Sequence, residues 1–83
     1  MYKIEIAPQA KKQLKDLKIR HKLSLLSIIE DLKDNLFAGK ALTRDFSGKY
    51  SYRVGVYRII YRINVKTKLV EIISAGHRSI VYN

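Results

Sequence analysis

The strongest constraint on this fold is a 14-residue stretch in which two alternating segments flank a two-residue turn. The segments are Tyr50–Val54 and Tyr57–Ile63, and the turn is Gly55-Val56. Glycine at the first of two central turn positions is typical of a type II′ turn, which joins antiparallel strands. A two-residue turn also fixes which residues face each other across the strands. The sequence therefore predicts a β-hairpin of defined register.

The predicted register gives the hairpin two chemically different faces, because opposed residues point to the same side of a sheet. The cross-strand pairs are Val54 with Tyr57, Arg53 with Arg58, Tyr52 with Ile59, and Tyr50 with Tyr61. The apolar face, which we expect to pack on helices, comprises Tyr50, Tyr52, Val54, Tyr57, Ile59, Tyr61 and Ile63. The opposite face comprises Ser51, Arg53, Arg58, Ile60 and Arg62.

Arg53 directly opposite Arg58 is a like-charge pair, which destabilises a sheet. Neither guanidinium group can lose its proton under ordinary conditions. An anion bound between them explains the pair, and planar guanidinium groups match phosphate oxygens better than lysine does. After Asp45 the chain has seven Lys and Arg residues and one carboxylate side chain, Glu71. Two other interpretations are open: a merely solubilising face, and neutralisation of Arg58 or Arg62 by Glu71.

The N-terminal half predicts one strand followed by two helices. Residues 2–7 alternate between apolar and polar side chains, as in a half-buried strand. Apolar residues at helical spacing predict helices over residues 9–18 and 22–36, with Gly39 just beyond the second as a stop signal. His21, between the helices, is expected to be solvated.

The C-terminal half predicts β structure. Residues 40–49 are expected to form a loop with a turn at Asp45-Phe46-Ser47-Gly48. Leu69–Ala75 is expected to pair antiparallel with the second hairpin strand and to end at Gly76, where the backbone turns. The predicted fold is therefore α+β with the order β-α-α-β-β-β, a helical hairpin packed on one face of a small, mostly antiparallel sheet.

Composition limits the classes of function. With 83 residues, the chain is expected to be one domain covering residues 1–83. A net charge of +10 favours a polyanionic partner, and a phosphate backbone is the commonest one. There is no cysteine for a disulfide or a thiolate metal site, as is usual in a reducing cytoplasm. No apolar run has the length of a membrane span, so we expect a cytoplasmic protein without membrane contacts.

A second group of candidate residues lies near the C-terminal end. Gly76 is followed by His77 and Arg78, and Tyr82 stands four residues further on. Because the last strand is expected to pair with the second hairpin strand, His77 and Arg78 should emerge beside Arg58. This segment and the arginine pair would then form one cationic pocket.

These residues resemble the RelE branch of the RelE/ParE toxin superfamily. The resemblance rests on the run from Tyr50 to Tyr61 combined with the run from Gly76 to Tyr82, and on the predicted element order. It implies a toxin of a type II toxin–antitoxin pair that enters the ribosomal A site and cuts mRNA. It also implies a cognate antitoxin, acidic and partly disordered, through which alone the complex would contact operator DNA.

The resemblance also implies roles for individual residues. Arg58 and Arg78 match family arginines that stabilise the transition state, and Arg78 is also a candidate for protonating the leaving group. Tyr82 matches a C-terminal tyrosine proposed to act as base or to orient the substrate. Arg53 stands where the best-known member has a lysine, and His77 replaces another lysine. A further lysine of that member has no counterpart in this shorter turn.

The expected reaction uses neither a metal nor a cofactor. The ribose 2′-hydroxyl would attack the adjacent phosphate, giving a 2′,3′-cyclic phosphate and a 5′-hydroxyl end. Among the candidates, His77 is chemically the best proton donor, because its ordinary pKa lies near neutrality. We expect additional RNA contacts from four basic residues: Lys49, Arg62, Lys11 and Lys15.

Two other functions are open on this sequence. One is a ParE-like toxin that inhibits DNA gyrase and needs no acid–base residues. The other is a non-catalytic basic module that binds RNA or the ribosome. The complete C-terminal group of Gly76, His77, Arg78 and Tyr82 favours the nuclease.

Overall fold

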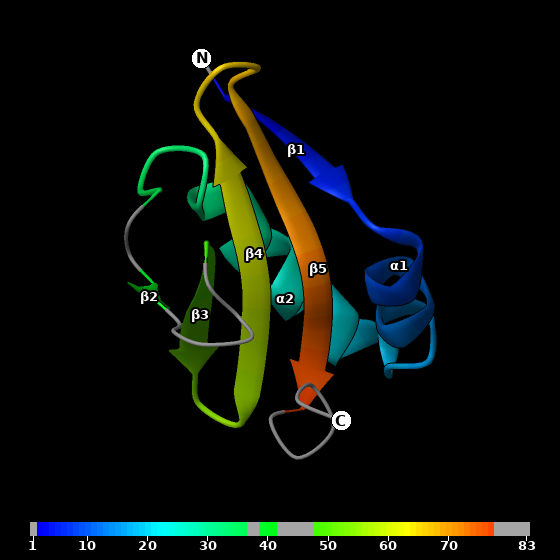
Figure 1. Cartoon of the computed structure of the whole chain (residues 1–83). Helices are drawn as coiled ribbons and strands as arrows, with labels where there is room; N and C mark the ends of the chain where they lie inside the picture. Colours follow the sequence, from blue (N-terminus) through cyan, green and yellow to red (C-terminus); the bar gives the residue numbers. More distant parts are fainter. Residues whose placement is uncertain (1, 37–38, 42–47, 78–83) are drawn as a thin grey trace.

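A mixed β-sheet with both helices packed against it makes up the described part of the chain (Figure 1). The computed structural model describes residues 2–36, 39–41 and 48–77. Its helices are α1 (Pro8–Lys15) and α2 (Ile19–Asp31). Its strands are β1 (Lys3–Ile6), β2 (Lys40–Ala41), β3 (Lys49–Val54), β4 (Tyr57–Asn64) and β5 (Leu69–His77).

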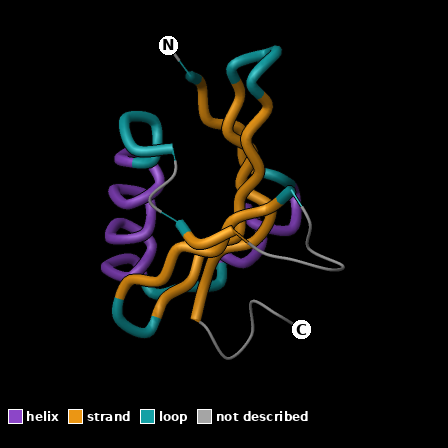
Figure 2. Tube along the Cα trace, turned by 60° about the vertical axis from the view of Figure 1, so that its left-hand side comes forward, coloured by secondary structure: helices purple, strands orange, loops and turns teal. Residues whose placement is uncertain are grey.

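The strands follow the order β1-β5-β4-β3-β2. β1 pairs with β5 in parallel, and the other neighbours are antiparallel. α2 lies along one face of the sheet, and α1 lies near the β1–β5 side (Figures 1 and 2). The other face of β3, β4 and β5 carries neither α1 nor α2 and is called the open face below. The predicted α+β fold is confirmed, with a short additional strand.

The predicted hairpin register is confirmed at every pair. Arg53 stands opposite Arg58, and the neighbouring pairs follow as the two-residue turn requires. Gly55 has a φ of 59°, whereas Val56 has no positive φ, as a type II′ turn requires. Six side chains of these strands belong to the core that α1 and α2 also form: Tyr50, Tyr52, Tyr57, Ile59, Tyr61 and Ile63.

Tyr61 connects the core to the segment that follows α2. Its side chain is fully buried and stacks on Tyr50, with ring centroids 5.5 Å apart. The Tyr61 hydroxyl donates to the carbonyl oxygen of Leu36 at 2.8 Å and accepts from the Gly39 N–H at 2.9 Å. A Cβ atom on Gly39 would lie 2.6 Å from the Tyr61 Oη, so only glycine fits here without a shift. Glycine at this position therefore serves close packing.

The second helix is shorter than the apolar spacing predicts. α2 ends at Asp31, and the next residues form turns in which N–H groups bond three residues back, as Leu32 does to Ile29 and Lys33 to Glu30. Leu32 and Leu36 nevertheless pack on the core. Tight turns keep a helix-like spacing of side chains, so the apolar pattern continues where the α-helix has ended.

The loop predicted over residues 40–49 is partly wrong. Lys40 and Ala41 form β2, which pairs with Ser51 and Tyr50 of β3, and β3 already begins at Lys49. A two-residue strand is too short for an alternation signal, which explains why the sequence did not predict it. Of the predicted turn, Asp45-Phe46-Ser47 lies outside the described residues.

β5 continues past the predicted end. It runs to His77 and contains a bulge: Ile60 faces Ser74 and Tyr61 faces Ile72, which leaves Ile73 as an extra residue. The predicted turn at Gly76 is wrong, because Gly76 pairs with Arg58. A glycine in a strand signals a bulge or a close approach as readily as a turn.

Gln13 of α1 closes the outer edge of β5 beyond β1. β1 pairs with β5 only as far as Ile72. Just past that point, the Gln13 Oε1 accepts hydrogen bonds from the Ser74 hydroxyl at 2.9 Å and the Ala75 N–H at 3.0 Å. A side chain thus replaces the missing strand as a partner for the edge.

Candidate functional site

The charged residues of β3, β4 and β5 on the open face belong to two rows of register partners. The arginine row consists of Arg53 on β3, Arg58 on β4 and Gly76 on β5. The lysine–arginine row consists of Lys49 on β3, Arg62 on β4 and Glu71 on β5. Between the rows lie Ser51 and Ile60, and Ile60 is only 3% exposed.

The arginine row joins an exposed cation to a partly buried one. Arg53 is exposed, whereas Arg58 is half-buried and its Nε atom is inaccessible to solvent. Gly76 is the register partner of Arg58 on β5 and carries no side chain. A guanidinium pair on this face can bind both sides of one phosphate.

Glu71 belongs to the lysine–arginine row. It faces Arg62, and the Arg62 Nη1 lies 3.8 Å from the Glu71 Oε1. Arg58 stands four residues from Arg62 along β4, about 13 Å at an ordinary strand rise. The sequence leaves open whether Glu71 neutralises Arg58 or Arg62, and the structure places Glu71 beside Arg62.

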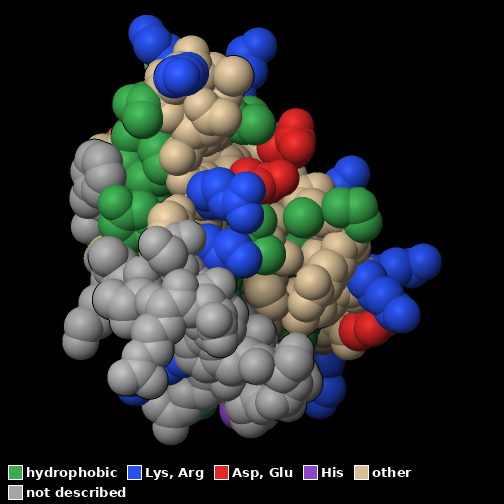
Figure 3. All heavy atoms as spheres, viewed as in Figure 1, with side chains coloured by type: hydrophobic (Ala, Val, Ile, Leu, Met, Phe, Trp, Pro, Cys, Tyr) green, Lys and Arg blue, Asp and Glu red, His purple; other side chains and the backbone are tan. Residues whose placement is uncertain are grey.

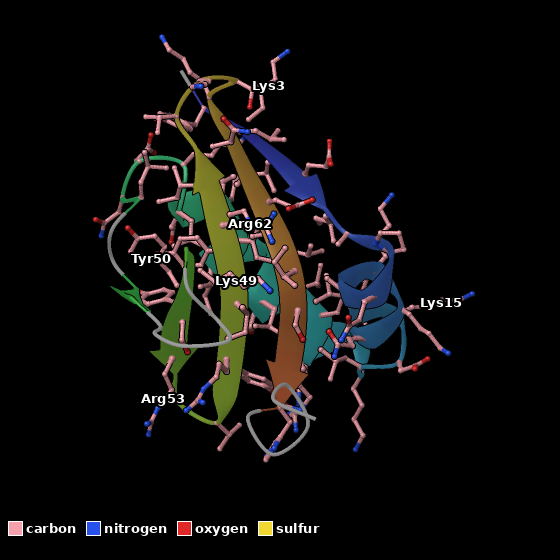
Figure 4. The ribbon with its side chains drawn as sticks, in the orientation of Figure 1. Lys3, Lys15, Lys49, Tyr50, Arg53 and Arg62 are labelled. Carbon is pink, nitrogen blue, oxygen red and sulfur yellow. The ribbon has the colours of Figure 1, made fainter. Side chains whose placement is uncertain are left out.

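The basic residues of the open face are visible in two views. Lys and Arg side chains gather near the middle of the face, with Asp and Glu side chains beside them (Figure 3). Lys49 and Arg62 lie over the middle of the sheet, and Arg53 lies near the end of β3 (Figure 4). Lys15 points outward from α1, away from these residues (Figure 4). Lys11 is exposed on the same helix. The predicted RNA contacts thus form two separate pairs: Lys49 and Arg62 on the open face, and Lys11 and Lys15 on α1.

Lys49 and Arg62 face each other across β3 and β4, although the sequence predicts them only as separate RNA contacts. The predicted hairpin register already contained this pair, because Tyr50 faces Tyr61 and the next residues outward are Lys49 and Arg62. The pair was missed because the strand was expected to begin at Tyr50.

The C-terminal candidates are only partly placed. His77 faces Tyr57, at the end of the sheet where Arg58 lies, which confirms its expected position along the strand. By strand alternation its side chain belongs to the face of Tyr57, and Gly76 belongs to the open face. Arg78 and Tyr82 lie outside the described residues.

His21 is not solvated as expected. It lies in the first turn of α2, is half-buried, and contacts Tyr57 with ring centroids 5.3 Å apart. No local pattern predicts this contact, because it joins residues 36 positions apart. The hairpin tyrosines predicted to be core residues are confirmed as such, since Tyr50, Tyr52, Tyr57 and Tyr61 all belong to the packed cluster.

The phenol of Tyr61 is unsuited to act as a base. Burial raises the pKa of Tyr61 above 10.0, which the hydrogen bond from Gly39 only partly offsets, so its phenol stays protonated. Within residues 2–36, 39–41 and 48–77, no three His, Asp or Glu side chains gather as potential metal ligands. No helix in this part of the chain has the length and apolar character needed to cross a membrane.

The chain matches a known protein family over nearly its whole length. A family model described as the ParE toxin of the type II toxin–antitoxin system parDE matches residues 4–82. Toxin RelG of Mycobacterium tuberculosis is 38% identical over 50 residues, or 60% of this chain. The match spans 58% of that protein's length.

Solved structures share the fold as well as part of the sequence. The toxin–antitoxin complex RelBE2 from Mycobacterium tuberculosis contains a chain that is 32% identical, with a TM-score of 0.85, covering 93% of this chain and 98% of that one. The archaeal RelE–RelB complex from Pyrococcus horikoshii contains a chain that is 26% identical, with a TM-score of 0.71, covering 95% and 97%.

Proposed function

Because the chain belongs to the ParE toxin family of type II toxin–antitoxin systems, within the RelE/ParE superfamily, we propose that it is an endoribonuclease that cleaves mRNA in the ribosomal A site. The observation that carries this proposal is the arginine row. Arg53 and Arg58 stand directly opposite each other on the sheet face that carries neither α1 nor α2, with Gly76 completing the row. That arrangement costs stability in the absence of an anion and binds a phosphodiester in its presence.

The proposed reaction is a transesterification within the RNA strand. The 2′-oxygen attacks the adjacent phosphorus and loses its proton, and the bond from phosphorus to the 5′-oxygen breaks. The products are a 2′,3′-cyclic phosphate and a 5′-hydroxyl end, which takes up one proton. Arg53 and Arg58 would offset the negative charge that grows on the phosphate oxygens in the transition state. Such a donor contributes about 10²–10³ in rate.

The acid and base are proposed from the C-terminal group. His77 and Arg78 are the candidates for protonating the leaving oxygen, and Tyr82 for accepting the proton or orienting the substrate. The strand register supports Arg53 and Arg58 more directly than His77, which alternation assigns to the face of Tyr57. No metal or cofactor is part of the proposal. Positioning of the reacting groups would supply much of the rate, and the ribosome would supply part of that positioning.

The proposed partners are the ribosome with its mRNA and a cognate antitoxin. Two similar chains were crystallised in toxin–antitoxin complexes, and a net charge of +10 suits an acidic, partly disordered antitoxin. Operator DNA would be contacted only through that antitoxin. Lys11 and Lys15 on α1 are proposed as outer contacts, separate from the open face. The protein would act in the cytoplasm.

A second candidate function is a ParE-like toxin that inhibits DNA gyrase. The description of the matching family model favours it, because that model is named for ParE toxins. This activity needs no proton transfer, so the arginine row would then serve binding alone. The two candidates therefore differ in whether mRNA is broken.

One experiment separates these functions. Purified protein is added to a cell-free translation reaction, and the mRNA ends are mapped by primer extension. We expect breaks at defined codon positions, and an Arg58→Ala variant that cleaves about 10²–10³ times more slowly. Lys12→Ala on α1 is the control for loss of one charge. Gyrase–DNA cleavage complexes without mRNA breaks would establish the second candidate. Ribosome binding with neither product would establish a non-catalytic module.

A further inference from the structure

The lysine–arginine row is a second basic pair on the same face and on the same two strands as the arginine row. Lys49 faces Arg62 across β3 and β4. The Arg62 side chain is 51% exposed, and both Lys49 and Arg62 lie over the middle of the sheet (Figure 4). Like charges directly opposite each other destabilise a sheet, and in this row the carboxylate of Glu71 lies beside Arg62.

The two rows are too far apart to share one phosphate. They are separated by four residues along β4, about 13 Å. Arg62 is also held within its own row, because its Nη1 lies 3.8 Å from the Oε1 of Glu71 on the neighbouring strand. A phosphate bound by Arg53 and Arg58 is therefore out of reach of Lys49 and Arg62, which would contact a different phosphate of the same strand.

Charge reverses across the lysine–arginine row. Lys49 and Arg62 occupy β3 and β4, whereas Glu71 and its register partner Glu5 occupy β5 and β1. Ile4 and Ile6 pack on the core, so Glu5 projects from the open face. A polyanion would be attracted to the β3–β4 side of this row and repelled from the β5–β1 side.

The ion pair of Arg62 is weak enough to yield to a phosphate. Its atoms lie beyond hydrogen-bond distance, and both side chains are partly exposed. Exposed ion pairs of this kind contribute little to stability. Glu71 thus orients Arg62 and competes for it at the same time.

We propose that Lys49 and Arg62 form a second phosphate-binding subsite that holds RNA along β3 and β4, and that Glu71 limits its affinity. This subsite deepens the proposed function and rests on it. It binds the substrate strand away from the bond that is cut, so it sets affinity and direction of the RNA rather than the chemical rate.

The test measures binding of single-stranded RNA with 2′-O-methyl groups, which cannot be cleaved because the attacking hydroxyl is blocked. Dissociation constants are determined over a series of salt concentrations by fluorescence anisotropy. Lys49→Gln and Arg62→Gln should each reduce the slope of log K against log salt by about 0.7, the value for one phosphate contact in a single strand. Glu71→Gln should tighten binding about threefold to fivefold at low salt.

Matched controls change the same charges away from the open face. Lys12→Gln and Asp16→Asn, both exposed and at α1, should leave the slope and the affinity close to the wild type. In single-turnover cleavage on programmed ribosomes, Lys49→Gln and Arg62→Gln should raise the half-saturating protein concentration and keep the saturated rate. Arg58→Gln should lower that rate.

The possible outcomes separate the two proposals. If the wild type cleaves mRNA while the slopes and half-saturating concentrations of Lys49→Gln and Arg62→Gln equal those of Lys12→Gln, the subsite is overturned and the nuclease stands. If the wild type cleaves no mRNA and binds no RNA, the proposed function fails and the subsite with it. Equal affinities of Glu71→Gln and Asp16→Asn would overturn the role of Glu71.

Discussion

Replacing Tyr61 by phenylalanine should destabilise the fold although it removes a single oxygen atom. The side chain is 0% exposed, and its hydroxyl makes two hydrogen bonds, to the Leu36 carbonyl at 2.8 Å and from the Gly39 N–H at 2.9 Å. Removing it leaves two part-buried backbone groups without this partner, at about 1–2 kcal/mol each. We therefore expect Tyr61→Phe to lower the free energy of unfolding by about 2–4 kcal/mol.

This loss is measurable by urea denaturation followed by circular dichroism. For a chain of this size, each kcal/mol lowers the Tm by about 4–8 °C, so the lower figure corresponds to about 8–16 °C. Tyr52→Phe is the matched control, because Tyr52 is half-buried on the same face, and its change should stay within about 0.5 kcal/mol. A Tyr61→Phe loss no larger than that of Tyr52→Phe would refute the reasoning.

A double-mutant cycle tests the same contact from the other side. A Cβ atom on Gly39 would lie 2.6 Å from the Tyr61 Oη, 2.9 Å from its Cε1 and 3.1 Å from the Ser51 carbonyl oxygen. Gly39→Ala should thus cost less in the Tyr61→Phe background, because the closest atom is gone. We expect a coupling energy of about 1 kcal/mol, within the range for residues in contact. Strict additivity would mean that the two residues do not constrain each other.

Three further outcomes follow from the geometry. Arg53→Gln should stabilise the fold by about 0.2–1 kcal/mol, because it removes the like charge opposite Arg58, while cleavage slows; equal or lower stability in a urea titration would contradict the repulsion. Gln13→Ala should cost about 1–2 kcal/mol and lower the hydrogen-exchange protection of the Ala75 N–H, whereas unchanged protection would show that Gln13 is dispensable. Since the pKa of Tyr61 is raised in the folded state, the unfolded chain holds fewer protons above pH 10.0, and stability should fall as pH rises through that value. Tyr61→Phe should lose less stability over the same alkaline range, and equal losses would refute that assignment.

The part of the fold that could be predicted is the part with local causes. A glycine in a two-residue turn and strict alternation on either side determined the hairpin register, and with it the pairing of Arg53 with Arg58. This pairing is the centre of the candidate site. It needed no information from distant parts of the chain, because turn length and alternation act over a few residues.

The features that escaped prediction depend on distant contacts. The place of β1 beside β5, the short strand β2 and the tilted ring contact between His21 and Tyr57 join segments far apart in sequence. The end of the second helix escaped because Leu32 and Leu36 remain in the core after the α-helical hydrogen bonds stop. The spacing of apolar residues predicts which side chains are buried, but it does not predict which other segment of the chain packs on them.

The extra residue in β5 also determines where this sheet tolerates changes in length. Ile73 has no register partner on β4, so a chain lacking it could keep all later pairs, from Ser74 with Ile60 to His77 with Tyr57. Deletion of a second residue before Gly76 would move Gly76 away from Arg58 and exchange the two faces of every following residue. We therefore expect relatives to differ by one residue in length at this position while keeping a glycine opposite the arginine that corresponds to Arg58. An alignment that places such a gap elsewhere would match residues on opposite sides of the protein over the stretch between the gap and Ile73.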